Sequence, residues 1–173
     1  MSDYPLISRR PLRVTVGGRD LLLPYAPAAE WISATRRLSV LVSQLATPED
    51  REALVDLVMD SPGGAEDLIQ EGKRILRHTT GRPWYEAQKL INTSMSAETL
   101  GRLRLAGVDP WECSVGEWCA CVYALYVKGA DTKERTKLDF SLALPPPGAE
   151  DEWDDGGSDP EATMSAVQAM MGQ

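Results

Sequence analysis

The sequence predicts a mainly α-helical protein: a small helical domain with an N-terminal β-hairpin and a disordered acidic C-terminal tail that ends in a short amphipathic helix. Apolar residues recur at helical spacing over most of the chain, and they alternate with polar residues only near the N-terminus. A stretch rich in proline, glycine and acidic residues then follows residue 144. We expect a flexible N-terminus at 1–10, the helical domain at 11–144, a linker at 145–157 and the terminal helix at 158–173.

The hairpin is predicted by alternation on both sides of a glycine pair. Leu12, Val14 and Val16 alternate with polar residues, Gly17–Gly18 supplies the turn, and residues 21–23 form the second strand. Pro24 and Pro27 end that strand, because proline donates no hydrogen bond to a strand ladder.

The first half of the domain contains three predicted helices. One continuous helix is expected from Ala28 to about Ala46, and a second starts after the N-cap Thr47 and Pro48. The third runs from Ala65 to about Thr80 and ends at Gly81. The residues expected to face inward are Trp31, Leu38, Leu41, Val42 and Leu45 in the first, Leu54, Val55, Leu57 and Val58 in the second, and Leu68, Ile69, Ile75 and Leu76 in the third.

Four helices are predicted in the second half. The first begins after Pro83 and continues to about Thr93, and the next starts at Ser96 and ends at Gly107, with Leu100, Leu103 and Leu105 inward. Ser114–Glu117 matches a capping box for a helix that ends at Lys128–Gly129. A last short helix is expected over 132–142.

The charge distribution separates the tail from the body. The chain has a net charge of −8, but residues 149–173 hold seven acidic residues and no Lys or Arg, so the rest is nearly neutral. Nucleic-acid binding needs clustered cations, and only Arg9, Arg10, Arg13 and Arg19 form such a group, so no nucleic-acid partner is expected. The longest apolar run, residues 118–127, is about half of a membrane span, so no membrane partner is expected either.

The residues do not predict an enzyme. His78 is the single histidine, and common hydrolase, nucleotide, zincin and dinucleotide fingerprints are missing. Cys113, Cys119 and Cys121 have a spacing that suits no zinc knuckle, so we interpret them as small apolar residues in a reducing compartment. No catalytic residue, cofactor or metal is predicted.

The tryptophans and the methionine-rich end are the candidates for partner binding. Trp31, Trp84 and Trp118 lie on apolar helical faces and are interpreted as core residues, whereas Trp111 lies in a turn and Trp153 lies among acids. The terminal helix carries an apolar stripe. The predicted partner-binding residues are Trp111, Trp153, Met164, Val167, Met170 and Met171. A frayed end or packing back onto the chain's own domain is the alternative for that stripe.

Two blocks of sequence resemble a known family. Leu12–Gly18 (LRVTVGG), followed by Leu23–Pro27 (LPYAP) and Trp31, resembles the opening of tail assembly chaperones from long-tailed (siphovirus-type) phages of actinobacteria. Residues 81–90 (GRPWYEAQKL), 105–110 (LAGVDP) and 117–118 resemble the same family's central signature. The resemblance covers about residues 11–128, and the family usually has a simpler residue in place of the cysteines.

The resemblance implies a non-catalytic chaperone that keeps the tape measure protein soluble while tail tube subunits polymerise around it. It implies a host-cytoplasmic protein that is absent from the mature virion, and a longer form of the same gene made by ribosomal frameshifting, of which this chain looks like the short counterpart. A homo-oligomer remains open. The alternative is a small acidic helical adaptor or regulatory protein whose acidic arm binds a basic host factor.

Overall fold

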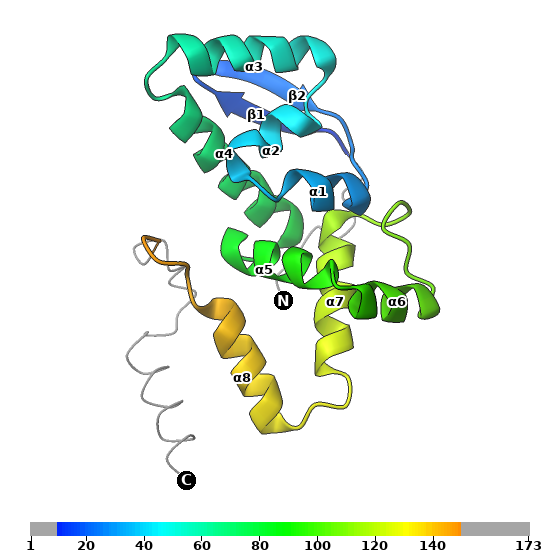
Figure 1. Ribbon diagram of the computed structural model, residues 1–173. Helices are drawn as coiled ribbons and strands as arrows, with labels where there is room; N and C mark the ends of the chain where they lie inside the picture. The colour runs from blue at the N-terminus through cyan, green and yellow to red at the C-terminus, as the bar shows by residue number, and fades with distance from the viewer. Residues whose placement is uncertain (1–9, 150–173) are drawn as a thin grey trace. The chain divides into compact units, whose positions relative to one another are not determined.

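The computed structural model describes residues 10–149 (Figure 1). Contacts divide the chain into two compact units, Met1–Ala143 and Leu144–Gln173. In the described part of the second unit, the Ala149 N–H donates to the Pro146 carbonyl at 3.0 Å. The disorder expected beyond 149, the terminal helix at 158–173 and the flexible residues 1–9 lie outside the described residues.

Within residues 10–149, eight helices and one two-stranded antiparallel sheet confirm the predicted mainly α-helical class with an N-terminal hairpin. In chain order the elements are β1 (Leu12–Val16), β2 (Arg19–Leu23), α1 (Ala28–Ala34), α2 (Leu38–Leu45), α3 (Pro48–Asp60), α4 (Gly64–Thr80), α5 (Trp84–Ser94), α6 (Ala97–Leu105), α7 (Val115–Val127) and α8 (Thr132–Ala143).

The hairpin forms as the sequence predicts. Gly17 and Gly18 have φ values of 57° and 78°, the positive values that both central residues of a type I′ turn require. The register pairs Val14 with Leu21 and Val16 with Arg19. One face of the hairpin, carrying Val14, Val16, Leu21 and Leu23, is buried in the core.

Helix α4 closes the outer edge of β1. The backbone groups of Arg13 and Thr15 point away from β2, as they do at every second position of an antiparallel pair. The Thr15 N–H donates to Glu71 Oε1 at 3.3 Å, and Arg74 Nη2 donates to the Arg13 carbonyl at 3.3 Å. Glu71 and Arg74 also form an ion pair at 2.7 Å. The pair therefore satisfies the strand edge that would otherwise be open to another chain.

The predicted continuous helix over 28–46 is wrong, because the chain breaks between α1 and α2. Thr35 is fully buried, and its Oγ1 donates to the Trp31 carbonyl at 2.6 Å, while Arg37 is extended with φ −139° and ψ 112°. The break lets α2 turn onto α4, where the Leu38 carbonyl would lie 3.0 Å from a Cβ at Gly72. Tertiary contact with α4 therefore overrides the continuous helical pattern.

Most predicted helix ends are confirmed. The Thr47 side chain accepts from the Asp50 N–H at 3.3 Å, and Gly81 ends α4 with φ 66°. The capping box of α7 is complete, since Ser114 Oγ accepts from the Glu117 N–H at 3.2 Å and Glu117 Oε2 accepts from the Ser114 N–H at 2.7 Å. These signals depend on neighbouring residues only, so the sequence suffices to find them.

The tryptophans predicted for the core do pack there. Trp31 and Trp118 are buried, and Trp118 Nε1 donates to Ser94 Oγ at 3.0 Å. Trp84 is half-buried against the core, with Lys73 Nζ 5.0 Å from its ring centroid. Cys119 is buried as well, in keeping with an apolar role.

Two residues expected to face inward are exposed instead. Leu105 is 92% exposed, because it lies two residues and therefore about 200° around α6 from the buried Leu103. Val55 of α3 is 55% exposed. It follows the buried Leu54 by one residue and so lies about 100° around the helix, beyond the narrow face that α3 buries.

Helix α8 is attached through polar contacts with α5 and α7 and through Leu138 and Leu142, which pack against the core. Lys89 Nζ donates to the Ser141 carbonyl at 2.7 Å and to the Leu142 carbonyl at 3.2 Å, near the end of α8. Tyr123 Oη donates to Asp139 Oδ1 at 2.7 Å, and the Arg82 guanidinium lies 4.8 Å from the Tyr123 ring centroid. Leu142 is the buried apolar contact of α8.

Candidate partner-binding surface

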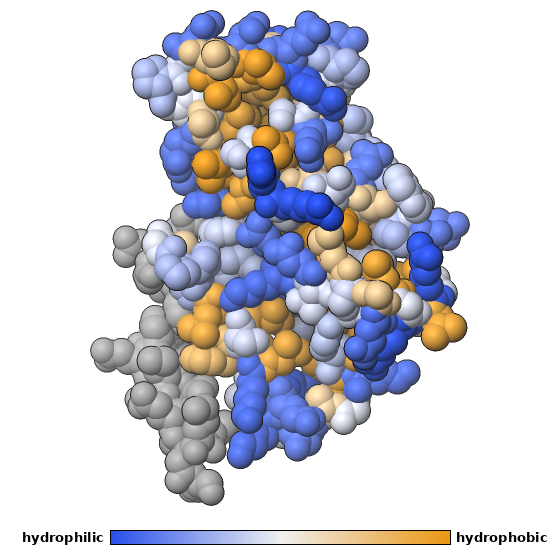
Figure 2. All heavy atoms as spheres, in the orientation of Figure 1, coloured by the Kyte–Doolittle hydropathy of each residue, from blue (hydrophilic) through white to orange (hydrophobic). Residues whose placement is uncertain are grey.

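Helix α3 presents apolar side chains to solvent. Val55 is 55% exposed and Met59 is 79% exposed, and the two are neighbours on the helix because they lie four residues apart. Val58, three residues from Val55, is half-buried against the core and continues the stripe inward. Figure 2 shows hydrophobic residues gathered at and just below α3 on this face of the molecule. We call Val55, Val58 and Met59, with the adjoining exposed acids Glu52, Asp56 and Asp60, the α3 surface.

The opposite side of α3 packs against the hairpin turn and α4. Leu57 covers Gly17 of the hairpin turn, where a Cβ would lie 2.5 Å from Leu57 Cδ1. The backbone of α4 approaches so closely that a Cβ at Gly64 would lie 2.6 Å from the Leu57 carbonyl. Leu54 is fully buried. These contacts fix which side of α3 faces solvent, so Val55 and Met59 are exposed by the fold itself.

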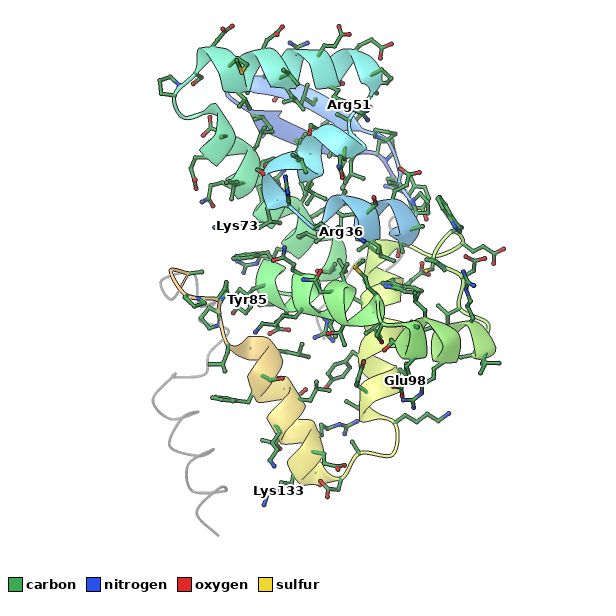
Figure 3. The ribbon with its side chains drawn as sticks, in the orientation of Figure 1. Arg36, Arg51, Lys73, Tyr85, Glu98 and Lys133 are labelled. Carbon is green, nitrogen blue, oxygen red and sulfur yellow. The ribbon has the colours of Figure 1, made fainter. Side chains whose placement is uncertain are left out.

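Arg51, the basic residue of α3, is engaged with α2. Its Nε donates to the Ser43 carbonyl at 2.9 Å, and its Nη2 donates to the carbonyls of Gln44 and Ala46 at 3.2 and 3.4 Å. The arginine therefore caps the C-terminal end of α2, where the helix dipole is negative, and Figure 3 shows it at the start of α3. Its charge is used for the fold.

Three acids of α3, unlike Glu49 and Asp50 in its first turn, have no such role. Glu52, Asp56 and Asp60 are exposed and lie four residues apart, so they form one row along the helix beside Val55 and Met59. Within residues 10–149, none of the three has an ion pair or a side-chain hydrogen bond. The α3 surface therefore has an apolar strip with a negative rim.

Trp111, a predicted partner-binding residue, is 67% exposed in the loop between α6 and α7. The backbone N–H of Trp111 donates to Asp109 Oδ1 at 2.9 Å. The loop is fixed to the start of α1, since the Ala28 and Ala29 N–H groups donate to the carbonyls of Cys113 and Pro110 at 2.9 Å each. The chain thus displays Trp111 from a loop that is hydrogen-bonded to α1, whereas α3 packs on α2, α4 and the hairpin turn.

The structure does not bring the other predicted partner-binding residues together with Trp111. Trp153, Met164, Val167, Met170 and Met171 lie outside the described residues. The sequence does not predict Met59 as a surface residue of this kind, and it predicts that Val55 faces the core. The signal that identifies both is the acidic row at Glu52, Asp56 and Asp60, which marks the solvent side of α3.

The thiols are poorly suited to nucleophilic chemistry. Burial raises the pKa of Cys113 to about 11 and that of Cys119 to about 12, so both are protonated at neutral pH, and the thiolate is the reactive form. Burial likewise raises the pKa of Cys121. Among residues 10–149, no group of three or more His, Cys, Asp and Glu residues is arranged to hold a metal ion.

A small cavity and two charged side chains of α5 belong to the fold. A cavity of about 30 Å³ at the base of the hairpin, lined in part by Trp31, His78 and Ser114, has room for about one water molecule. On α5, burial raises the pKa of Glu86 although Arg82, 3.3 Å away, opposes that shift. Burial lowers the pKa of Lys89, which donates to the end of α8. Of these groups, Lys89 positions α8 directly.

None of the helices described between residues 10 and 149 has the length and apolarity needed to cross a membrane. Comparisons with protein-family models, with curated proteins and with solved structures give no match for this chain.

Proposed function

We propose that this chain is a non-catalytic protein that binds amphipathic helical segments of a longer polypeptide, and that it is the short form of a phage tail assembly chaperone whose client is the tape measure protein. The α3 surface carries the proposal, because Val55 and Met59 expose neighbouring apolar side chains on one helix, where the apolar stripe of another helix would cover them. The choice of client comes from the resemblance of residues 11–128 to the chaperone family.

The size of the apolar strip favours weak, reversible binding. Full burial of one Val or Met side chain contributes about 1.5–3 kcal/mol. Since Val55 and Met59 are already partly buried, covering both contributes about 2–4 kcal/mol, which is small beside the entropy that association costs. Several copies along a long helical client would protect it, and polymerising tail tube subunits would displace each copy readily.

Co-expression tests the proposal directly. The full chain would be expressed in a bacterial cytoplasm with a candidate tape measure protein, and the client's soluble fraction would be measured. The double variant Val55→Ser with Met59→Ser is expected to reduce that fraction at least by half. Leu105→Ser is the matched control, because Leu105 is more exposed but lies alone on α6. A client that is equally soluble with both variants, or with no chain at all, would refute the proposal.

The acidic adaptor is the competing function, and the same assay separates it. A full-length variant in which the seven acids of residues 149–173 become Asn or Gln leaves the α3 surface intact. The chaperone proposal expects this variant to keep the client soluble. Loss of partner binding in this variant, with full binding by the Val55→Ser, Met59→Ser double variant, would favour the adaptor.

A further inference from the structure

The acidic row on α3 opposes helix stability. Glu52 and Asp56 lie four residues apart, as do Asp56 and Asp60, and like charges at that spacing repel each other along the helix. Neither a cap nor an ion pair within the described chain uses these carboxylates. The row runs beside the exposed pair Val55 and Met59, so it borders the docking strip along two turns of helix.

The charge of this border selects among the possible occupants of the strip. The chain's own C-terminal segment, residues 149–173, has no Lys or Arg, so it offers the acidic row no opposite charge. A second copy of the chain that docks antiparallel through α3 would place the same acids against each other, and in either orientation its α3 surface would bring no basic residue to the row. A partner with basic residues faces neither penalty.

We propose that the α3 surface selects an amphipathic helix whose apolar stripe is flanked on one side by Lys or Arg. The inference rests on the proposed function for a helical partner and adds the charge of that partner. Successive acids of the row are about 6 Å apart along the axis, because the helix rises 1.5 Å per residue. A partner helix that lies along α3, with basic residues at every fourth position, matches that spacing while its apolar residues cover Val55 and Met59.

Three synthetic helices test this charge preference. They share one apolar stripe and differ only in the flanking residues, which are Lys, Gln or Glu. Binding to the full chain would be measured by fluorescence anisotropy at low and high salt. Each exposed ion pair between a partner Lys and an acid of the row contributes little alone. Three such ion pairs together are expected to make the Lys helix bind about tenfold more tightly than the Glu helix at low salt. High salt is expected to remove most of this difference.

Asp56→Lys separates binding from folding. The change replaces two like-charge pairs of α3 with opposite-charge pairs, so the melting temperature is expected to stay the same or rise. The preference for the Lys helix is expected to disappear or reverse. Glu30→Lys is the matched control, because it makes the same change in net charge at an exposed position of α1 and is expected to preserve the preference.

The outcomes distinguish this inference from the proposed function. Equal affinity for the three helices, or an unchanged preference in Asp56→Lys, would overturn the charge preference. If Val55→Ser with Met59→Ser then weakens all three complexes, apolar docking on α3 still stands. No binding of any helix would overturn both proposals.

Discussion

Replacing Glu71 with alanine is expected to destabilise the protein much more than the same change at another acid of α4. Glu71 is 93% shielded from solvent and receives three hydrogen bonds, two from Arg74 at 2.7 Å and one from the Thr15 N–H at 3.3 Å. The substitution removes all three bonds. It also leaves Arg74 without the carboxylate that orients it toward the Arg13 carbonyl.

The structure gives the size of the effect. A hydrogen bond to a charged group contributes about 1.5–3 kcal/mol, but Arg74 and the edge of β1 reach water, which compensates part of the loss. We therefore expect Glu71→Ala to lower the free energy of unfolding by about 2 kcal/mol. Glu71→Gln keeps an acceptor for the Thr15 N–H and is expected to cost about half as much.

Urea unfolding followed by tryptophan fluorescence measures the difference. Glu66→Ala is the control, since Glu66 is exposed on the same helix and accepts only from Gln70, at 2.6 Å. Its effect is expected to stay within about 0.5 kcal/mol. Hydrogen exchange at the Thr15 amide is expected to speed up in Glu71→Ala alone. Equal stability of Glu71→Ala and Glu66→Ala would show that α4 does not close the edge of β1.

Three further predictions concern the core and its titrating groups. Trp118→Phe is expected to lower the free energy of unfolding in urea by about 2 kcal/mol, because it removes the hydrogen bond to Ser94 and leaves a void in the core. A change below about 0.5 kcal/mol would contradict this. Because burial raises the pKa of Glu86, the folded state holds its proton more tightly than the unfolded state, and this group's contribution to stability falls as pH rises above 4.5. In melting scans from pH 4 to pH 7, Glu86→Gln is expected to lose that decline, whereas an unchanged slope would refute the assignment. At pH 8 a thiol-specific disulfide reagent is expected to label Cys119 only on unfolding, because burial raises its pKa to about 12, and rapid labelling of the native protein would be inconsistent with that burial.

The sequence predicts the local structure well where neighbouring residues determine it. The glycine pair of the hairpin, the proline after Thr47 and the capping box at Ser114 each act within four residues, and each has the predicted consequence. The break at Thr35 is different. It depends on the approach of α2 to Gly72, which lies far along the chain and leaves no mark in the periodicity of residues 28–46.

The candidate surface was harder to predict for the same reason. The helical spacing places Val55 beside Leu54 on the apolar side of α3. Whether that whole side is buried depends on how many other elements pack against α3, which the spacing does not show. The burial of Glu71 is also a tertiary effect, because its partner Thr15 lies 56 residues earlier. The exposure of Trp111 follows from its turn, which the sequence does reveal, while its role in binding a partner stays a prediction.

Helix α3 carries an exposed apolar pair directly beside a row of three acids. An exposed Val55 and Met59 contribute little to a monomer's stability, and a row of three acids at four-residue spacing lowers it. A basic residue at position 56, between Glu52 and Asp60, would stabilise the helix, and the fold would tolerate it because Asp56 is exposed. A sequence selected for monomer stability alone has no physical reason to keep both features side by side. A basic amphipathic partner supplies that reason, because it covers the apolar pair and neutralises the row in a single contact.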